Sequence, residues 1–248
     1  MLSLSQLCPD YEGLELGIGE SLLMKAIAQG MGRDMAKIRK DFDRLGDLGT
    51  VAVASRQKQS TMFKPKRLTV PQVFKELKGI AQMTGNQSQQ RKVDTIVKLL
   101  AACEGDETKY LIRSLEGKLR IGLAERSVIV ALAQAIVYTK VASKKLGEAA
   151  LAQKIEAGTD IVKAVFSELP SYDLVVPALL DGGVEQLREK CKLTPGVPLK
   201  PMLAKPTKAI GEVLDRFEGK KFTCEYKYDG ERAQVHYLEG GKLAIFSR

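Results

Sequence analysis

The sequence predicts a mainly α-helical chain that ends in the start of an α+β region. Apolar residues recur at helical spacing through the first two thirds of the chain, prolines concentrate after it, and apolar and polar residues then alternate. A spacing of 3.6 residues places apolar side chains on one face of a helix, whereas a spacing of two places them on one face of a strand. We therefore expect a helical domain over 1–192, a proline-rich linker over 193–206 and a second domain over 207–248.

The helices of the first domain are predicted from apolar stripes and from residues that begin or end a helix. Ser21 follows a glycine-rich break and is expected to be the N-cap of a helix. A core-facing stripe with the spacing i, i+3, i+4, i+7 is formed by Val93, Ile96, Val97 and Leu100. Pro170 is expected to end another helix. The expected helices are 21–29, 88–103, 124–138, 148–168, about 173–182 and 184–190.

The second domain is predicted from a change of period after the linker. The segment 192–206 holds four of the nine prolines, so it cannot continue a helix and is expected to be extended. A short helix is expected at about 207–217. Beyond it, apolar and polar residues alternate, with turn signals at Asp229-Gly230 and Gly240-Gly241. These signals predict the opening strands of a sheet, and we expect the domain to be incomplete at its C-terminal end.

Composition narrows the classes of function. A net charge of +9 indicates a polyanionic partner, either nucleic acid or an anionic membrane. No apolar run reaches 18 residues, so we expect no transmembrane helix. The single histidine, His236, rules out a multi-histidine metal site, and we assign it no catalytic role. The four cysteines are far apart and form no CxxC pair, so they are expected to be buried, reduced thiols: Cys8, Cys103, Cys191 and Cys224.

A lysine flanked by carboxylates marks the strand expected at 223–229, at the start of the sheet. Alternation along a strand would place Glu225, Lys227 and Asp229 on one face. A nucleophilic lysine must lose its proton, whereas neighbouring carboxylates hold it charged, so its reactivity requires a bound cation and nucleotide. Arg232 and Arg248 are candidates to contact a phosphate. The short K-x-D-G pattern fits an exposed hairpin with a Lys–Asp pair equally well.

A second basic group is flanked by glycines between two expected helices. The segment GKLRIG places Lys118 and Arg120 between Gly117 and Gly122. Glycine permits close approach of the backbone to a ligand, and long cationic side chains suit the narrow, negative minor groove of DNA. A loop between helices, with glycine caps and solvated charges, explains the same residues, and the sequence leaves both interpretations open.

The helix expected at 88–103 begins with polar and basic residues. Ser88, Arg91 and Lys92 lie in its first turn, where cations oppose the helix dipole. An anion bound at the start of the helix would offset this repulsion. Solvation of the charges is the simpler explanation.

Four segments of the chain resemble the ATP-dependent DNA ligases, most nearly those of the eukaryotic replicative type. The resemblance implies an all-α DNA-binding domain, N-terminally incomplete, and the start of an α+β nucleotidyltransferase (adenylation) domain. It also implies a fragment truncated at both ends. The segments are FTCEYKYDGERAQVHYLEGGKLAIFSR at 222–248, GVPLKPMLAKPT at 196–207, RSLEGKLRIGLAERSV at 113–128 and EGLELGIGESLLMKAIAQ at 12–29.

The resemblance implies a role for each residue around the lysine. Lys227 would attack the α-phosphorus of ATP and carry AMP, while Glu225 would contact the adenine. Asp229 would help to orient the lysine and the nucleotide, Arg232 would contact the AMP, and Arg248 would lie beside the nucleotide or the nick phosphate. Mg²⁺ would neutralise charge during phosphoryl transfer, with no metal ligand within this chain.

The resemblance also implies how DNA is held and where the protein acts. The GKLRIG loop would lie in the minor groove of nicked duplex DNA, and Arg113 would be a further DNA-binding residue. The implied setting is the nucleus, in DNA replication, repair and recombination, with replication-clamp proteins contacted through regions outside this chain. Two alternatives remain open: a duplex-DNA-binding module without catalysis, and a relative of the RNA-capping enzymes and RNA ligases.

Overall fold

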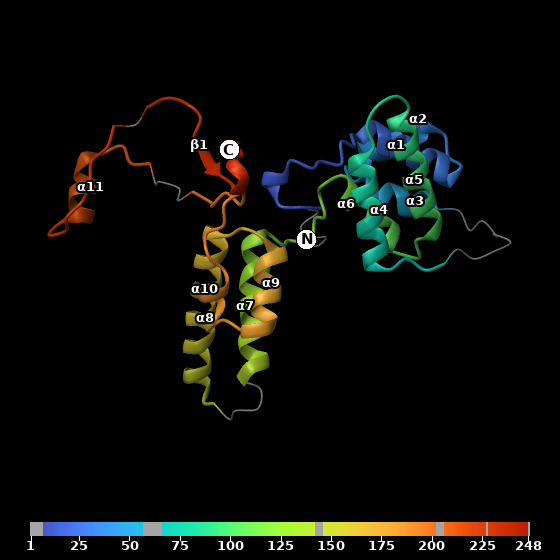
Figure 1. Cartoon of the computed structure of the whole chain (residues 1–248). Helices are drawn as coiled ribbons and strands as arrows, with labels where there is room; N and C mark the ends of the chain where they lie inside the picture. The colour runs from blue at the N-terminus through green and yellow to red at the C-terminus, as the bar shows by residue number, and fades with distance from the viewer. Residues whose placement is uncertain (1–6, 57–65, 142–145, 202–205, 227, 248) are drawn as a thin grey trace. The chain divides into compact units, whose positions relative to one another are not determined.

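The computed structural model describes residues 7–56, 66–141, 146–201, 206–226 and 228–247. The chain forms two compact units, Met1–Val128 and Ile129–Arg248, and it is mainly helical, as the sequence predicts (Figure 1). In the described residues each unit has its own hydrophobic core, so the helical region expected over 1–192 contains two cores. No described helix has the length and apolar character needed to cross a membrane.

Three helices of the first unit begin after residues whose side chains accept hydrogen bonds from free backbone N–H groups. The Asp34 carboxylate accepts hydrogen bonds from two N–H groups of the next helix, and Thr69 Oγ1 accepts one from Gln72 N. Gly32 and Gly46 end two helices in the left-handed conformation that glycine adopts without strain. The helices are α1 (Glu20–Met31), α2 (Met35–Leu45), α3 (Leu48–Ser55), α4 (Val70–Gln82), α5 (Ser88–Ala102) and α6 (Glu107–Leu115).

The core of the first unit is built from the apolar faces of these helices. Helix α1 packs on α5, and α3 packs on α6. Leu23 and Ile27 of α1, Ile96 and Leu100 of α5 and Ile112 of α6 are fully or almost fully buried. The burial of Ile96 and Leu100 confirms the stripe predicted for α5. The non-polar area removed from water here is the main source of the stability of this unit.

The second unit contains the helices α7 (Glu125–Val141), α8 (Glu148–Glu168), α9 (Tyr172–Gly182) and α10 (Leu187–Lys190). These helices lie side by side in Figure 1, and the first residues of α7 belong to the first unit. Val162, Leu179 and Leu187 form the centre of its core. Gly158 permits close packing of α7 and α8, because a Cβ at this position would lie 2.7 Å from Val137 Cγ2.

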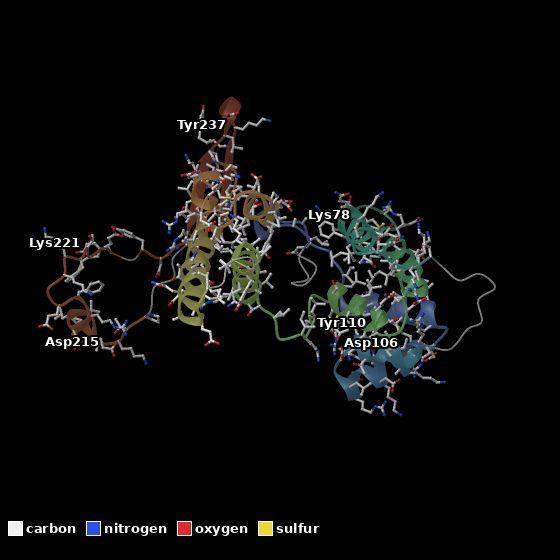
Figure 2. The ribbon with its side chains drawn as sticks, turned by 90° about the horizontal axis from the view of Figure 1, so that it is seen from below. Lys78, Asp106, Tyr110, Asp215, Lys221 and Tyr237 are labelled. Atoms are coloured by element: carbon white, nitrogen blue, oxygen red, sulfur yellow. The ribbon has the colours of Figure 1, made fainter. Side chains whose placement is uncertain are left out.

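The end of the second unit carries α11 (Ile210–Phe217) and an antiparallel hairpin, β1 (Ala233–Tyr237) and β2 (Leu243–Ser247). The hairpin reverses at Gly240 and Gly241, which have φ values of 79° and 78°, so the predicted turn is confirmed. Tyr237 projects from the hairpin into solvent (Figure 2).

The proline-rich linker is hydrogen-bonded to the hairpin. Gly196 N donates to His236 Nδ1 at 2.9 Å. Leu199 donates from its N–H to Gln234 Oε1 at 3.1 Å and accepts from Gln234 Nε2 at 2.7 Å. Lys200 N donates to Ser167 O in α8 at 2.8 Å. The linker therefore joins α8 to β1 through specific bonds, and the one histidine of the chain has a structural contact.

Some element boundaries differ from the predictions. Ser21 is not the N-cap of α1: the helix begins at Glu20, and the extended Gly19 carbonyl accepts from Leu22 N and Leu23 N. The helix expected at 124–138 extends to Val141, and those expected at 184–190 and 207–217 are shorter at their starts. The helices at 88–103, 148–168 and 173–182 are confirmed to within one residue.

The strand expected at 223–229 is wrong for every residue of that segment that the structure describes. A strand needs a neighbouring backbone to satisfy its N–H and C=O groups. In the described residues β1 pairs with β2 alone, so no strand lies beside the described part of this segment. Its tyrosines are also exposed, with Tyr226 at 91% and Tyr228 at 84%.

The cysteines are free thiols, but they are not all buried. Cys8, Cys103 and Cys191 are buried, whereas Cys224 is exposed, which corrects the expectation for that residue. Burial raises the pKa of the Cys103 thiol to about 11. Because the thiolate is the reactive form, Cys103 stays unreactive near neutral pH.

We expect N-ethylmaleimide at pH 7.5 to modify Cys224 well before the buried thiols, because Cys224 is exposed and Cys103 is buried with a raised pKa. Peptide mass spectrometry over a time course would measure the order of labelling. Adding urea should bring the rate at Cys103 up to that at Cys224. Equal rates in the folded protein would contradict the burial seen at Cys103.

Candidate nucleic-acid interface and nucleotide segment

The GKLRIG segment forms a loop (residues 117–122, the 117–122 loop) between α6 and α7. Gly117, Arg120 and Gly122 have φ values of 75°, 53° and 70°. Glycine adopts positive φ without strain, whereas an L-residue such as Arg120 pays roughly 1–2 kcal/mol for it. Lys118 N donates to Arg113 O at 2.9 Å, which closes the end of α6. The loop therefore has a specific, partly strained backbone.

Arg120 attaches the 117–122 loop to the turn between α2 and α3. Its Nη2 donates to Gly46 O at 2.6 Å, a hydrogen bond between residues that are 74 positions apart in the sequence. A charge-assisted hydrogen bond of this kind offsets the strain of the positive φ.

Lys118 lies beside two carboxylates. Its Nζ is 3.2 Å from Glu116 Oε1 and 3.7 Å from Glu20 Oε1. Its side chain is 56% exposed, whereas that of Glu116 is only 4% exposed. A DNA phosphate would therefore have to compete with these carboxylates for an ammonium that solvent, and hence a ligand, can reach.

Arg113, on α6, contacts both Asp47 and the 117–122 loop. Its Nε donates to both carboxylate oxygens of Asp47, each at 3.2 Å, and its Nη2 also donates to Asp47 Oδ2. Its Nη1 lies 3.5 Å from Leu119 O in the loop. The side chain is 12% exposed. These contacts occupy the guanidinium fork. The DNA contact expected from Arg113 stays a prediction.

Asp47 is a residue that the sequence analysis missed. Its Oδ1 accepts from Gly49 N at 3.0 Å and its Oδ2 from Thr50 Oγ1 at 2.6 Å, so it is the N-cap of α3. The hydrogen bond from Arg113 is the main cause that holds the pKa of this carboxyl well below its usual value. An aspartate just before an apolar helical run is a recognisable N-cap signal, but it gives no indication of Arg113.

Gly49 allows the contact between Asp47 and Arg113. A Cβ on Gly49 would lie 2.6 Å from Lys109 O and 3.0 Å from Arg113 Cγ. Any larger side chain would therefore separate α3 from α6. Tyr110, labelled in Figure 2, also lies on α6, and the Arg113 guanidinium carbon is 5.9 Å from its ring centroid.

The basic residues at the start of α5 differ in exposure. Ser88 is the first residue of the helix, and the exposed Arg91 donates through Nη2 to Thr84 O at 2.8 Å. Lys92 is buried, and its Nζ donates to Leu16 O at 2.6 Å. This corrects the expectation of a surface cation at Lys92, because backbone carbonyls before α1 take up its ammonium.

The nucleotide segment is described only in part. Lys227 and Arg248 lie outside the described residues. Glu225, Asp229 and Arg232 are exposed. Because the described residues there form no strand, the structure does not place Glu225 and Asp229 on the common face that alternation predicts. Among the described residues there is no group of three or more His, Cys, Asp or Glu side chains that fits a metal ion.

Two family models match opposite ends of the chain. The model described as DNA ligase N terminus matches residues 1–133, and the model described as ATP dependent DNA ligase domain matches residues 201–248. The first match includes the 117–122 loop with its support from α3 and α6. The second includes Lys227 and the hairpin.

Relatives match the chain over its whole length. It is 58% identical over 247 residues to DNA ligase 1 of Schizosaccharomyces pombe and 49% identical over 249 residues to DNA ligase 1 of Saccharomyces cerevisiae, with all of this chain covered. It is 35% identical to a DNA ligase of Caldivirga maquilingensis, with 99% of this chain and 39% of the relative covered. The chain spans about a third of the two yeast proteins, 32% and 33%.

Proposed function

The chain belongs to the DNA ligase family, and from this we propose that it is part of an ATP-dependent DNA ligase that seals nicks in duplex DNA through a lysine–AMP intermediate. The observation that carries the proposal is the match of two different ligase models to the two ends of one chain. A shared DNA-binding region alone would explain only the first match.

The proposed chemistry has three phosphoryl-transfer steps, and Lys227 is the nucleophile of the first. The uncharged amine attacks the α-phosphorus of ATP, the bond to pyrophosphate breaks, and the nitrogen loses a proton to form the phosphoramidate. The 5′-phosphate at the nick then attacks the AMP phosphorus and releases the amine. The 3′-hydroxyl attacks the activated 5′-phosphate, loses its proton and expels AMP.

The residues around Lys227 are proposed to hold the nucleotide. Glu225 supplies an acceptor for the adenine amino group, and Asp229 orients the lysine and the nucleotide. Arg232 and Arg248 offer planar, permanently charged donors to phosphate oxygens. Mg²⁺ would supply positive charge to phosphoryl transfer in the whole enzyme; the described residues contain no group of three or more His, Cys, Asp or Glu side chains that fits it.

Duplex DNA is proposed to bind at the first unit, with the 117–122 loop in the minor groove. The net charge of +9 supports a polyanionic partner. The exposed Lys118 and Arg120 are the proposed contacts in the loop, and Ser88 and Arg91 are proposed to contact the backbone. We place the whole enzyme in the nucleus, in replication, repair and recombination, with replication-clamp proteins as partners through other regions.

A labelling experiment on the whole protein tests this function. With ATP labelled at the α-phosphate, we expect label on the protein, then on the 5′-phosphate of a nicked duplex, then release as AMP with a sealed strand. Duplex binding without label on the protein would leave only a DNA-binding module. Label that passes to RNA 5′ ends in preference to nicks would favour the RNA-capping or RNA-ligase alternative.

The loop cations should contribute to the salt dependence of DNA binding. For residues 1–248 on a nicked duplex, we expect Lys118→Ala and Arg120→Ala each to weaken binding and to reduce the slope of log K against log salt by roughly 0.9 per lost phosphate contact. Fluorescence anisotropy at several salt concentrations would measure this. Lys98→Ala, an exposed change on α5, is the control and should leave the slope unchanged. Identical slopes in all variants would remove the loop from the interface.

A further inference from the structure

We propose that the buried Asp47–Arg113 ion pair is a positioning device for the 117–122 loop: it sets the loop conformation that binds duplex DNA, and neither side chain contacts the DNA. This inference rests on the proposed function of the loop. It assigns Arg113 a role different from the DNA contact that the family resemblance implies, and it adds Asp47.

The contacts concentrate on two consecutive residues of the α2–α3 turn. Gly46 O accepts a hydrogen bond from Arg120, and the Asp47 carboxylate accepts three from Arg113. The Arg113 fork also reaches Leu119 O. Both guanidinium groups therefore link this turn to the 117–122 loop, one from within the loop and one from α6. A shift of the turn would move both supports together.

Burial separates the supporting residues from the residues that can reach DNA. The Asp47 side chain is 7% exposed and that of Arg113 is 12% exposed, whereas that of Lys118 is 56% exposed. A phosphate cannot reach a guanidinium that is covered by protein and already bonded to a carboxylate. Arg113 therefore influences the DNA through the position of Lys118 and Arg120.

The charge and the backbone geometry support the same conclusion. Asp47 and Arg113 together carry no net charge, so the pair adds little to the long-range attraction of a polyanion. The ion pair can instead hold the backbone of the loop in place. Arg120 requires such support, because its φ of 53° is unfavourable for a non-glycine residue. Without support from the pair, the loop would relax towards more common backbone conformations.

The test is a set of conservative variants of residues 1–248, measured on a nicked duplex. Arg113→Lys keeps the charge but loses the fork, and Asp47→Asn keeps an oxygen that can cap α3 but loses the ion pair. We expect each to weaken binding roughly tenfold, an effect of the size seen for coupled neighbouring residues. In the Lys118→Ala, Arg120→Ala background, Arg113→Lys should have almost no further effect. The exchange rate of the Lys118 amide, which donates to Arg113 O, should rise in both single variants.

The chain offers a matched control at the other end of α3. Arg33 bonds to Asp41 at 2.8 Å and to Ser55 Oγ at 2.6 Å, and it involves no residue of the loop. Arg33→Lys should lower the melting temperature as Arg113→Lys does, but should leave DNA affinity within about twofold. This separates a loss of loop geometry from a general loss of stability.

The outcomes are distinct. If Arg113→Lys and Asp47→Asn bind DNA as the unmodified chain does, the inference is wrong. If the loss from Arg113→Lys adds in full to the loss from the loop variants, Arg113 contacts the DNA itself, which also overturns it. A chain that does not bind duplex DNA at all would refute the proposed function instead, and the amide exchange of Lys118 would still report whether the pair holds the loop.

Discussion

Replacing Lys227 with alanine should reduce transfer of AMP from ATP to the whole enzyme by at least about a thousandfold, in the range found when a catalytic nucleophile is removed. The alanine side chain has no lone pair with which to attack the α-phosphorus, and no neighbouring group in the Glu225–Asp229 segment is an amine. The label that remains on the protein after denaturation, with ATP labelled at the α-phosphate, measures this step alone.

Two further variants sharpen this prediction. Lys227→Arg keeps the positive charge, but a guanidinium does not lose its proton in proteins, so it should be as inactive as alanine. Lys221→Ala removes an amine six residues away and should keep full labelling; Lys221 is labelled in Figure 2. Duplex binding should remain within about twofold in all three variants, because the proposed DNA contacts are separate. Persistent labelling of Lys227→Ala would assign the nucleophile to another lysine.

Replacing Asp47 with alanine should lower the free energy of unfolding of the first unit by about 3–5 kcal/mol, the usual cost of removing one partner of a buried ion pair. The variant leaves the guanidinium of Arg113, whose side chain is 12% exposed, without its counter-charge, and it also uncaps α3. Urea unfolding followed by circular dichroism would measure the change, and Asp34→Ala, which removes an exposed N-cap, should cost only about 1 kcal/mol.

The contribution of Asp47 should depend on pH in a defined direction. Because Arg113 lowers the pKa of Asp47 in the folded state, the ionised carboxylate stabilises the fold above the unfolded pKa of about 3.9. This stabilisation is lost as the pH falls through the folded pKa. The difference in unfolding free energy between the unmodified chain and Asp47→Ala should therefore be constant from pH 5 to 7 and shrink below about pH 4. A difference that grows in acid would contradict the ion pair.

The helices of this chain were predictable where local patterns decide the structure. Helix α5 follows from the spacing of Val93, Ile96 and Leu100, which are all buried. Helix α8 ends just before Pro170, as the proline requires. The hairpin turn at Gly240-Gly241 was predictable because glycine adopts without strain the positive φ values that these positions have. In each case neighbours in the sequence supply the determining interaction.

The features that the sequence did not indicate depend on distant residues. Asp47 and Arg113 are 66 positions apart, and Lys92 and Leu16 are 76 apart, so no local pattern relates them. Alternation around Glu225 describes which side chains would share a face, but a strand also requires a hydrogen-bonding partner, which local sequence does not specify. Arg113 and Lys92 were expected to be surface cations, but they bond to Asp47 and to Leu16 O inside the protein.

The hydrogen bonds of the linker have a mechanical consequence. Between Gly196 and Lys200 every residue except Pro198 has an amide hydrogen, and each of these amides donates, to His236, Thr194, Gln234 or Ser167. A segment whose composition suggests a flexible linker is therefore a rigid connection between the end of α8 and β1. A force applied to the hairpin would be transmitted through these hydrogen bonds to the helices, so the hairpin and α8 should move together as one rigid body.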